Sequence, residues 1–425
     1  MRYAPTLSAC AALFLLPLGA RAQCIGDCDR DRSVSIAEVL RGVTISLGGA
    51  AAETCESFDR NRDDVVGVDE LVSGVANALD GCPRQTQAFV STTSFQEGSY
   101  ATVDLDAPRP VTPSSAQRRT YSDAVIRSFD GFVYVVNRLF ADNIQVLDPA
   151  DKLRTRLQCS TGNGTNPHDI AFVNRHKAYV TLFEERELLI VNPSARPDCK
   201  DFILGRIDLS SLADQDGVPD MDLMTIVGDR LYVSLQRLDI HTVLRSPAEN
   251  GALAIVDTTT DQLIGSIELS GENPFTGSKG LLVRDGGIWV SEVGEFNTLD
   301  GGLERVDLAT GTSSGIVVSE ADLGGDITDV AFVSDELAYA VVNRPGFTTA
   351  LVSFNPSTRQ VLASLVETNG YNFFDIELND RGELFLADRT RQRSGIRIFR
   401  ASDGTPLIEN PINLALPPFA ILFLP

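Results

Sequence analysis

Carboxylates alternate with other residues near the start of the chain, in the stretch "DCDRDRSVSIAE". Asp27, Asp29 and Asp31 occupy every second position, and Glu38 follows seven residues after Asp31. A loop of this spacing gathers oxygens, and calcium takes six to eight oxygen ligands in flexible geometry. Because like charges held close together repel one another, a bound cation removes an electrostatic penalty. The spacing therefore predicts a calcium site.

The same pattern recurs 32 residues later, in "DRNRDDVVGVDE". Each loop has twelve positions, counted from Asp27 in the first loop and from Asp59 in the second. Position 6 usually carries glycine. Here it is Arg32 or Asp64, so each must adopt a backbone conformation that glycine adopts more easily. A pair of Asp-rich turns without metal is the alternative. The predicted ligands of two Ca²⁺ sites are Asp27, Asp29, Asp31, Ser33, Ser35 and Glu38 in the first loop and Asp59, Asn61, Asp63, Val65 and Glu70 in the second.

A short amphipathic helix is predicted after each loop, with one apolar face formed by Val39, Leu40 and Val43 or by Leu71, Val72, Val75 and Leu79. This loop-then-helix pair, about residues 24–82, resembles the dockerin-like variant of the EF-hand. The resemblance implies a calcium-dependent fold. Dockerins attach secreted enzymes to cohesin scaffolds through loop positions 10 and 11, often Ser-Thr. Here those positions are Ile36-Ala37 and Val68-Asp69, which argues against a cohesin-type partner.

Bulk composition narrows the class of protein. The chain has 425 residues and a formal net charge of -22, which disfavours nucleic acid as a partner and suits divalent cations or basic partners, or simply solubility. A basic start, a short apolar run and "ARA" predict a signal peptide over residues 1–22 and export to the extracellular space or cell envelope. No other stretch is long and apolar enough for a membrane span.

Six cysteines follow the predicted signal peptide, and an even number in an exported chain predicts disulfides. Cys24, Cys28, Cys55 and Cys82 allow three pairings, with a four-thiolate zinc site as the alternative. Cys159 and Cys199 are expected to form a bridge of their own. The small module is placed at 23–83 and a polar linker at 84–87.

From residue 88 onward, short strand-like phrases repeat in a fixed order. The first phrase recurs at steps of 46, 53, 58, 49 and 46 residues, and these positions are Asp123, Asp169, Asp222, Gly280, Asp329 and Asp375. Such spacing is typical of four-stranded propeller blades. The C-terminal phrase "PPFAILFLP" matches the first strand that the opening phrase from Phe89 lacks. The fold is therefore predicted as mainly β, a seven-bladed propeller over 88–425 closed by its C-terminal strand.

This region resembles the seven-bladed propellers of the YVTN and related repeat families. Their functions include carbohydrate binding, protein scaffolding, lactone hydrolysis and quinone-cofactor oxidation, so the resemblance selects none. Loops on one face of the ring should converge at the channel mouth. The residues predicted there are Asn137, Arg138, His168, Asp169, Asp222, Lys279, Glu292, Asp329, Asn343, Arg344, Asp388 and Arg389.

Several of these residues have a purely structural interpretation. The repeated aspartates satisfy backbone N–H groups in many turns, and the arginines can pair with them. We expect a secreted calcium-binding protein whose propeller is a binding platform for a glycan, peptide or envelope partner. The alternative is an enzyme, a lactonase-like hydrolase or oxidoreductase, in which His168 acts with nearby acids and Arg138 or Arg344 holds an anionic substrate.

Overall fold

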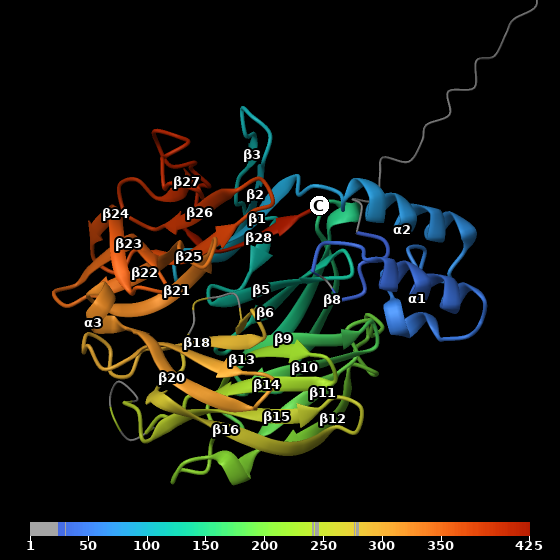
Figure 1. Cartoon of the computed structure of the whole chain (residues 1–425), viewed down its shortest axis with the longest axis horizontal. Helices are drawn as coiled ribbons and strands as arrows, with labels where there is room; N and C mark the ends of the chain where they lie inside the picture. Colours follow the sequence, from blue (N-terminus) through green and yellow to red (C-terminus); the bar gives the residue numbers. More distant parts are fainter. Residues whose placement is uncertain (1–23, 30, 240–241, 243–245, 276, 278–279) are drawn as a thin grey trace, which may run out of the picture.

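The computed structural model describes residues 24–29, 31–239, 242, 246–275, 277 and 280–425. The predicted signal peptide and Lys279 lie outside the described residues. Figure 1 shows a ring of β-sheets with a small helical module at its side. Seven sheets form the ring, which confirms the predicted seven-bladed propeller.

The blades follow the chain, and within each the strands are antiparallel neighbours. Blade 1 is β28 (Pro418–Leu424), β1 (Gln87–Thr93) and β2 (Gly98–Asp104), with short β3 (Val111–Thr112) and β4 (Arg119–Thr120). Blade 2 is β5 (Ala124–Phe129), β6 (Phe132–Asn137), β7 (Asn143–Asp148) and β8 (Arg154–Ser160). Blade 3 is β9 (Pro167–Asn174), β10 (Lys177–Leu182), β11 (Glu187–Val191) and β12 (Ile203–Asp208).

The remaining blades repeat this plan. Blade 4 is β13 (Met221–Val227), β14 (Arg230–Leu235), β15 (Asn250–Asp257) and β16 (Gln262–Glu272). Blade 5 is β17 (Leu282–Arg284), β18 (Gly287–Glu292), β19 (Gly302–Asp307) and β20 (Thr312–Ser319), followed by α3 (Glu320–Leu323). Blade 6 is β21 (Asp326–Phe332), β22 (Ala338–Arg344), β23 (Thr348–Asn355) and β24 (Gln360–Asn369), and blade 7 is β25 (Phe373–Leu378), β26 (Glu383–Asp388) and β27 (Gly395–Arg400).

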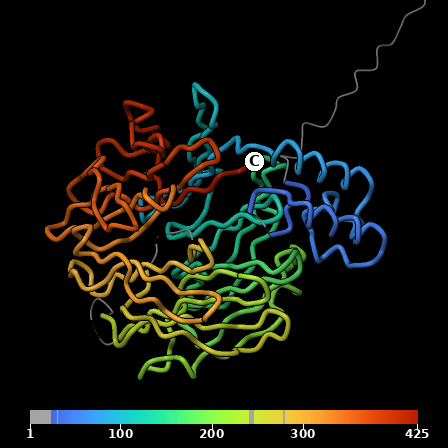
Figure 2. The backbone as a smooth tube through the Cα atoms, viewed as in Figure 1, coloured from blue at the N-terminus to red at the C-terminus, as the bar shows by residue number. Residues whose placement is uncertain are grey.

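The C-terminal strand closes the ring. β28 pairs with β1, with Ala420 opposite Ser91, and Figure 2 shows the C-terminal end beside the start of the propeller. The sheet that opens the propeller is thus completed by the last strand, as predicted. Closure hides strand edges that would otherwise pair with other chains.

Neighbouring blades are joined by buried apolar side chains and by buried aspartates. Tyr179 and Tyr339 are fully buried. Three first-strand aspartates each accept a backbone N–H from the next blade: Asp169 from Met224 at 2.8 Å, Asp329 from Ile376 at 2.8 Å and Asp375 from Ile421 at 2.6 Å. Asp169 and Asp329 also accept the N–H of the following residue in their own strand. These bonds support the structural interpretation of the aspartates.

The module consists of α1 (Ile36–Ser46), a 3₁₀ turn (Ala52–Cys55) and α2 (Val68–Asp80), packed around Phe58. Gly42 and Gly74 face its ring, and a Cβ added at them would lie 2.6 and 2.3 Å from it. Leu40, Val72 and Leu79, predicted on apolar faces, are 60, 62 and 80% exposed. The helices therefore approach each other through glycine, and most of the apolar face lies outside the core.

Three disulfides are present among the described residues: Cys24–Cys82, Cys28–Cys55 and Cys159–Cys199. The Cys159–Cys199 bridge confirms the predicted pairing. The other two bridges are one of the three pairings that the sequence allowed for the four module cysteines. Bridges of this number indicate an oxidising compartment. Among the described residues, no helix combines the length and hydropathy that a membrane crossing requires.

Candidate functional site

The first carboxylate loop brings oxygens together. One ligand atom from each of Asp27, Asp29 and Glu38 lies within 4.8 Å of the others, and Asp27 and Glu38 are each 8% exposed. Asp27 Oδ2 accepts the backbone N–H of Arg32 at 3.0 Å. Arg32 has φ 68°, the left-handed conformation expected at position 6. Carboxylate oxygens in this arrangement suit a hard cation such as Ca²⁺.

Glu38 is held in place by the start of α1. Ser35 caps this helix, and its backbone N–H and Oγ donate to Glu38 Oε2 at 2.7 and 2.8 Å. Glu38 Oε1 accepts the N–H of Cys28 at 2.7 Å. Burial acts to raise the pKa of Glu38, but these hydrogen bonds together lower it, so the carboxylate stays ionised. Asp31 and Ser33 are exposed and bonded to each other, with Ser33 N–H donating to Asp31 Oδ1 at 2.8 Å.

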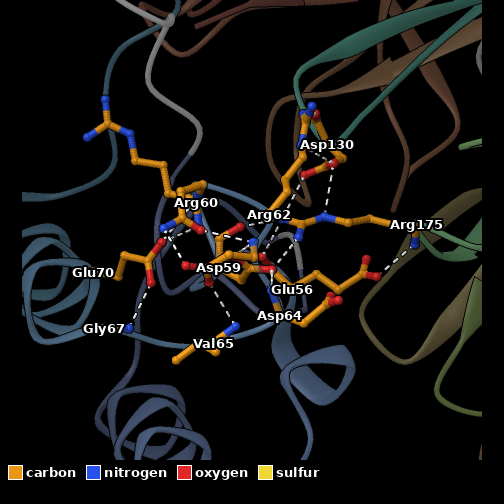
Figure 3. Close-up of polar contacts among 12 residues, drawn as sticks. Glu56, Asp59, Arg60, Arg62, Asp64, Val65, Gly67, Glu70, Asp130 and Arg175 are labelled. Atoms are coloured by element: carbon orange, nitrogen blue, oxygen red, sulfur yellow. Dashed lines mark hydrogen bonds and ion pairs between the residues drawn. The ribbon is translucent and has the colours of Figure 1, made fainter.

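The second loop has the same hydrogen-bond pattern, shown in Figure 3. Asp59 and Glu70 are 1 and 3% exposed. Asp59 Oδ2 accepts the N–H of Asp64 at 3.1 Å, and Glu70 Oε2 accepts that of Gly67 at 2.8 Å. Asp64 has φ 62°. Asn61, Asp63 and Val65 lie within the loop, and Asp63 Oδ1 accepts the N–H of Val65 at 3.0 Å. One difference is a propeller arginine, Arg175, bonded to Asp59 at 2.7 Å.

The mouth of the channel holds a cavity of about 650 Å³. Its polar wall includes Arg138, His168, Asp222 and Asn343, all predicted to face the channel mouth. Its other walls are aromatic. The sequence-based prediction named polar and charged residues and did not include these rings. These rings are Phe95, Tyr121, Phe140, Phe275, Phe296, Tyr371, Phe373, Phe374 and Phe419. The phrases "YNFFD" and "PPFA" could have indicated this wall, since Phe373, Phe374 and Phe419 are among the first residues of β25 and β28 and Tyr371 comes shortly before β25.

His168 and Asp222 form a hydrogen-bonded pair in this cavity. His168 Nδ1 lies 2.8 Å from Asp222 Oδ1, and Asp222 Oδ2 accepts Gln236 Nε2 at 2.9 Å. The imidazole stacks on Phe183 with 4.3 Å between ring centroids. Burial lowers the pKa of His168, and the bond to Asp222 opposes this only in part. A neutral imidazole that donates through Nδ1 has Nε2 as a proton acceptor.

Two arginines flank the cavity differently. Arg138 donates to Asp123 Oδ1 through Nη2 at 2.5 Å and Nε at 3.0 Å. Arg389 is bonded to three backbone carbonyls and lies over the rings of Phe95, Phe374 and Phe419. Burial lowers the pKa of Arg389 to about 10. Arg389 therefore supports the aromatic wall and is absent from the cavity lining, whereas Arg138 lines it.

Other predicted residues lie apart from this cavity. Asn137 lines a separate cavity of about 410 Å³. Asp169 and Asp329 are buried between blades, as described above. Arg344 pairs with Glu367 at 2.6 Å and Asp388 with Arg397 at 2.6 Å. The structure thus brings four of the predicted residues together around the channel cavity, and the residues of this paragraph lie outside its lining.

Glu292 is fully buried beside Glu304 in blade 5. Burial, followed by the charge and hydrogen bond of Glu304, raises the pKa of Glu292 to about 9. Glu292 is therefore protonated at neutral pH, away from the channel cavity.

Comparisons with known proteins concern the fold. No protein-family model matches the chain, and no curated protein sequence matches it. Similar solved structures include apo AztD from Citrobacter koseri, at 10% identity and TM-score 0.49, covering 81% of this chain and 99% of that one. A functionally unknown protein from Desulfotomaculum acetoxidans has 12% identity and TM-score 0.50 over 80 and 99%. At these identities no function follows, and the dockerin and YVTN resemblances stay predictions.

Proposed function

We propose that this is an exported calcium-binding protein in which a helical module binds a partner and a propeller binds a ligand at its channel mouth. The observation that carries the calcium assignment is the convergence of Asp27, Asp29 and Glu38 oxygens within 4.8 Å. The donor set fits Ca²⁺, which prefers carboxylate and carbonyl oxygens. Bound Ca²⁺ would supply charge neutralisation for the loops and so stabilise the module.

Isothermal titration of the full chain with Ca²⁺ tests this assignment. We expect heat of binding and a higher unfolding temperature with Ca²⁺ than with chelator, because the ion binds the folded loops and not the unfolded chain. Glu38→Gln keeps the side-chain size and should weaken binding at the first loop. The control is Glu53→Gln, an exposed residue outside both loops. Absence of heat together with an unchanged unfolding temperature would refute calcium binding.

An exposed apolar surface on the module supports partner binding. The surface has two matching halves, one on α1 and its C-terminal cap and one on α2, with residues spaced four, three and four apart: Ile36, Leu40, Val43 and Leu47, and Val68, Val72, Val75 and Leu79. Their exposed fractions run from 37 to 82%. Exposed apolar side chains that repeat along one face of a helix are typical of interaction sites. Because these exposed side chains are apolar, we propose a protein partner with an apolar contact face.

Charge substitutions on this surface test partner binding. A partner captured from native secretions should lose affinity for Leu40→Asp and Val72→Asp by more than tenfold, because a charge would be buried at the contact. Ser73→Ala, on the same helix, is the control. Equal affinity for all three variants would show that the partner binds elsewhere. Self-association of the chain through this face would appear in sedimentation and would contradict a separate partner.

The channel cavity supports binding of a glycan. Its walls combine aromatic rings with a few hydrogen-bonding groups, including His168, Gln236 and Asn343, a composition typical of sites for small ligands. A sugar ring has an apolar face that packs on aromatic rings and hydroxyls that bond to such groups. Screening of oligosaccharides against the wild type and Phe374→Ala tests this, with Leu362→Ala on the outer strand β24 as control. Binding of peptides but not sugars would overturn the glycan assignment.

Hydrolysis is a second candidate, favoured by the His168–Asp222 pair in the cavity wall. A neutral imidazole oriented by a carboxylate is able to act as a general base toward water. Turnover of ester or glycosidic test substrates should fall at least about 100-fold in His168→Gln if the pair is catalytic. Ligand binding without turnover, unchanged by Asp222→Asn, would leave the binding function and exclude this one.

A further inference from the structure

The propeller places a basic side chain against the second carboxylate loop. Arg175 lies in the turn between β9 and β10, and its guanidinium reaches Asp59 at position 1 (Figure 3). Nη1 donates to Asp59 Oδ2 at 2.7 Å, and Nη2 donates to the Asp59 carbonyl oxygen at 2.5 Å. The exposed side-chain fractions of Arg175 and Asp59 are 6 and 1%. The pair is thus removed from solvent.

Other acidic groups and carbonyls hold Arg175 at this place. Its Nη2 also donates to the Glu56 carbonyl at 2.9 Å, its Nε to Asp130 Oδ2 at 3.0 Å, and its backbone N–H to Glu56 Oε1 at 2.7 Å. Asp130 additionally pairs with Arg62 of the loop at 3.1 Å. A guanidinium group is not deprotonated in proteins, and here it is surrounded by the carboxylates of Asp59 and Asp130. Arg175 is therefore a permanent positive charge beside the loop.

We propose that Arg175 lowers the calcium affinity of the second loop, so that the first loop is the tighter site and fills first. This inference rests on the proposed calcium binding. A guanidinium bonded to Asp59 already neutralises part of the charge that attracts Ca²⁺. It also repels an ion bound to the same carboxylate, and in a site removed from water this repulsion is weakly screened.

The charge count of the two loops acts in the same direction. The first loop has four carboxylates at the ligand positions, whereas the second has Asn61 where the first has Asp29. Calcium affinity in such loops rises with ligand charge. The sequence alone therefore predicts a modest difference, and the contact from Arg175, 116 residues away along the chain, should enlarge it.

Calcium titration of the full chain by calorimetry tests the inequality. In the wild type we expect two events whose dissociation constants differ at least tenfold. Glu38→Gln should abolish the tighter event and Glu70→Gln the weaker. Arg175→Gln should tighten the weaker event about tenfold, while Arg175→Lys, which keeps the charge, should leave it weak. Two equal events, loss of the tighter event in Glu70→Gln, or an unchanged second site in Arg175→Gln would each overturn the inference.

The outcomes separate this inference from the proposed function. Equal events refute only the role of Arg175, whereas absence of any calcium binding refutes the calcium function and the inference together. Near-ultraviolet circular dichroism checks that Arg175→Gln keeps its tertiary structure. If it does not fold, the assignment of the wild-type events by Glu38→Gln and Glu70→Gln still decides which loop is tighter, and a tighter second loop overturns the inference.

Discussion

His168 Nδ1 lies 2.8 Å from Asp222 Oδ1, although the residues are 54 positions apart and begin neighbouring blades. The contact exists because the first strands of blades 3 and 4 run side by side around the channel. Asp169 occupies the same repeat position as Asp222, but it accepts a backbone N–H from the next blade. One repeat position thus serves blade packing in some blades and the cavity wall in another.

The protonation of His168 is a first testable consequence. Burial lowers its pKa, so its NMR titration midpoint should fall below the ordinary value of about 6.5. Asp222→Asn should lower it further, because the carboxylate favours the imidazolium. The sign for stability follows: a depressed pKa means that stability is present above pH 6.5 and is lost as the pH falls below it. His168→Gln assigns the signal, and a midpoint above 6.5 would contradict the geometry.

The buried carboxyl of Glu292 predicts the opposite dependence. Its pKa of about 9 in the folded state exceeds the ordinary value of 4.5, so the folded chain keeps a proton that the unfolded chain releases. This contribution to stability is complete below pH 4.5 and is lost as the pH rises toward 9, at up to about 1.4 kcal/mol per pH unit. The unfolding temperature of Glu292→Gln should therefore exceed that of the wild type at pH 8.5 and equal it at pH 4.5.

The exposed Glu409 provides the matched control for that comparison. Glu409→Gln should leave the unfolding temperature unchanged at pH 4.5 and pH 8.5, because the side chain is exposed and makes no core contact. A Glu292→Gln variant that is less stable than the wild type at pH 8.5 would show that the ionised carboxylate has a partner in the folded protein.

The glycine contact in the module predicts strong steric sensitivity. Gly74→Ala should destabilise the module by about 1–3 kcal/mol or more, since its Cβ would lie 2.3 Å from the Phe58 ring and the core has to shift. Gly265→Ala, where an added Cβ meets nothing within 4 Å, is the control. Chemical denaturation followed by circular dichroism measures both, and equal stability of the two variants would argue against close approach of the helices.

Closure of the ring predicts that the last strand is indispensable. Removing residues 418–425 uncovers β1 and takes away Ile421, whose N–H bonds to Asp375 at 2.6 Å. We expect loss of cooperative unfolding and aggregation through the exposed edges. The exposed-side substitution Leu407→Ala serves as a control near the same end of the chain. A soluble, cooperatively unfolding truncated chain would contradict closure by β28.

Much of the fold was predictable because it is encoded by short-range order. The blades repeat a pattern of strand and turn phrases, and the return of "PPFAILFLP" to the first blade follows from counting those phrases. The two carboxylate loops were likewise visible, since each lies within twelve consecutive residues. Their backbone turns at Arg32 and Asp64 were expected from the missing glycine and are present.

The candidate sites were less predictable, because their residues meet only in space. The convergence of nine aromatic rings at the channel mouth depends on how seven blades are arranged around one axis. The exposure of Leu40 and Val72 followed from two glycines that let Phe58 fill the space between the helices. Helical periodicity identifies an apolar face, but it does not say whether another element covers that face.

The sequence by itself determined the repeating blades, the closing strand and the oxygen-rich loops, because local spacing sets strand length, turn position and the reach of neighbouring side chains. Only the tertiary structure decided the pairing of the four module cysteines, the bond between His168 and Asp222, and the contact of Arg175 with Asp59. These contacts join residues far apart in the chain, and their partners are selected by the packing of whole sheets and helices.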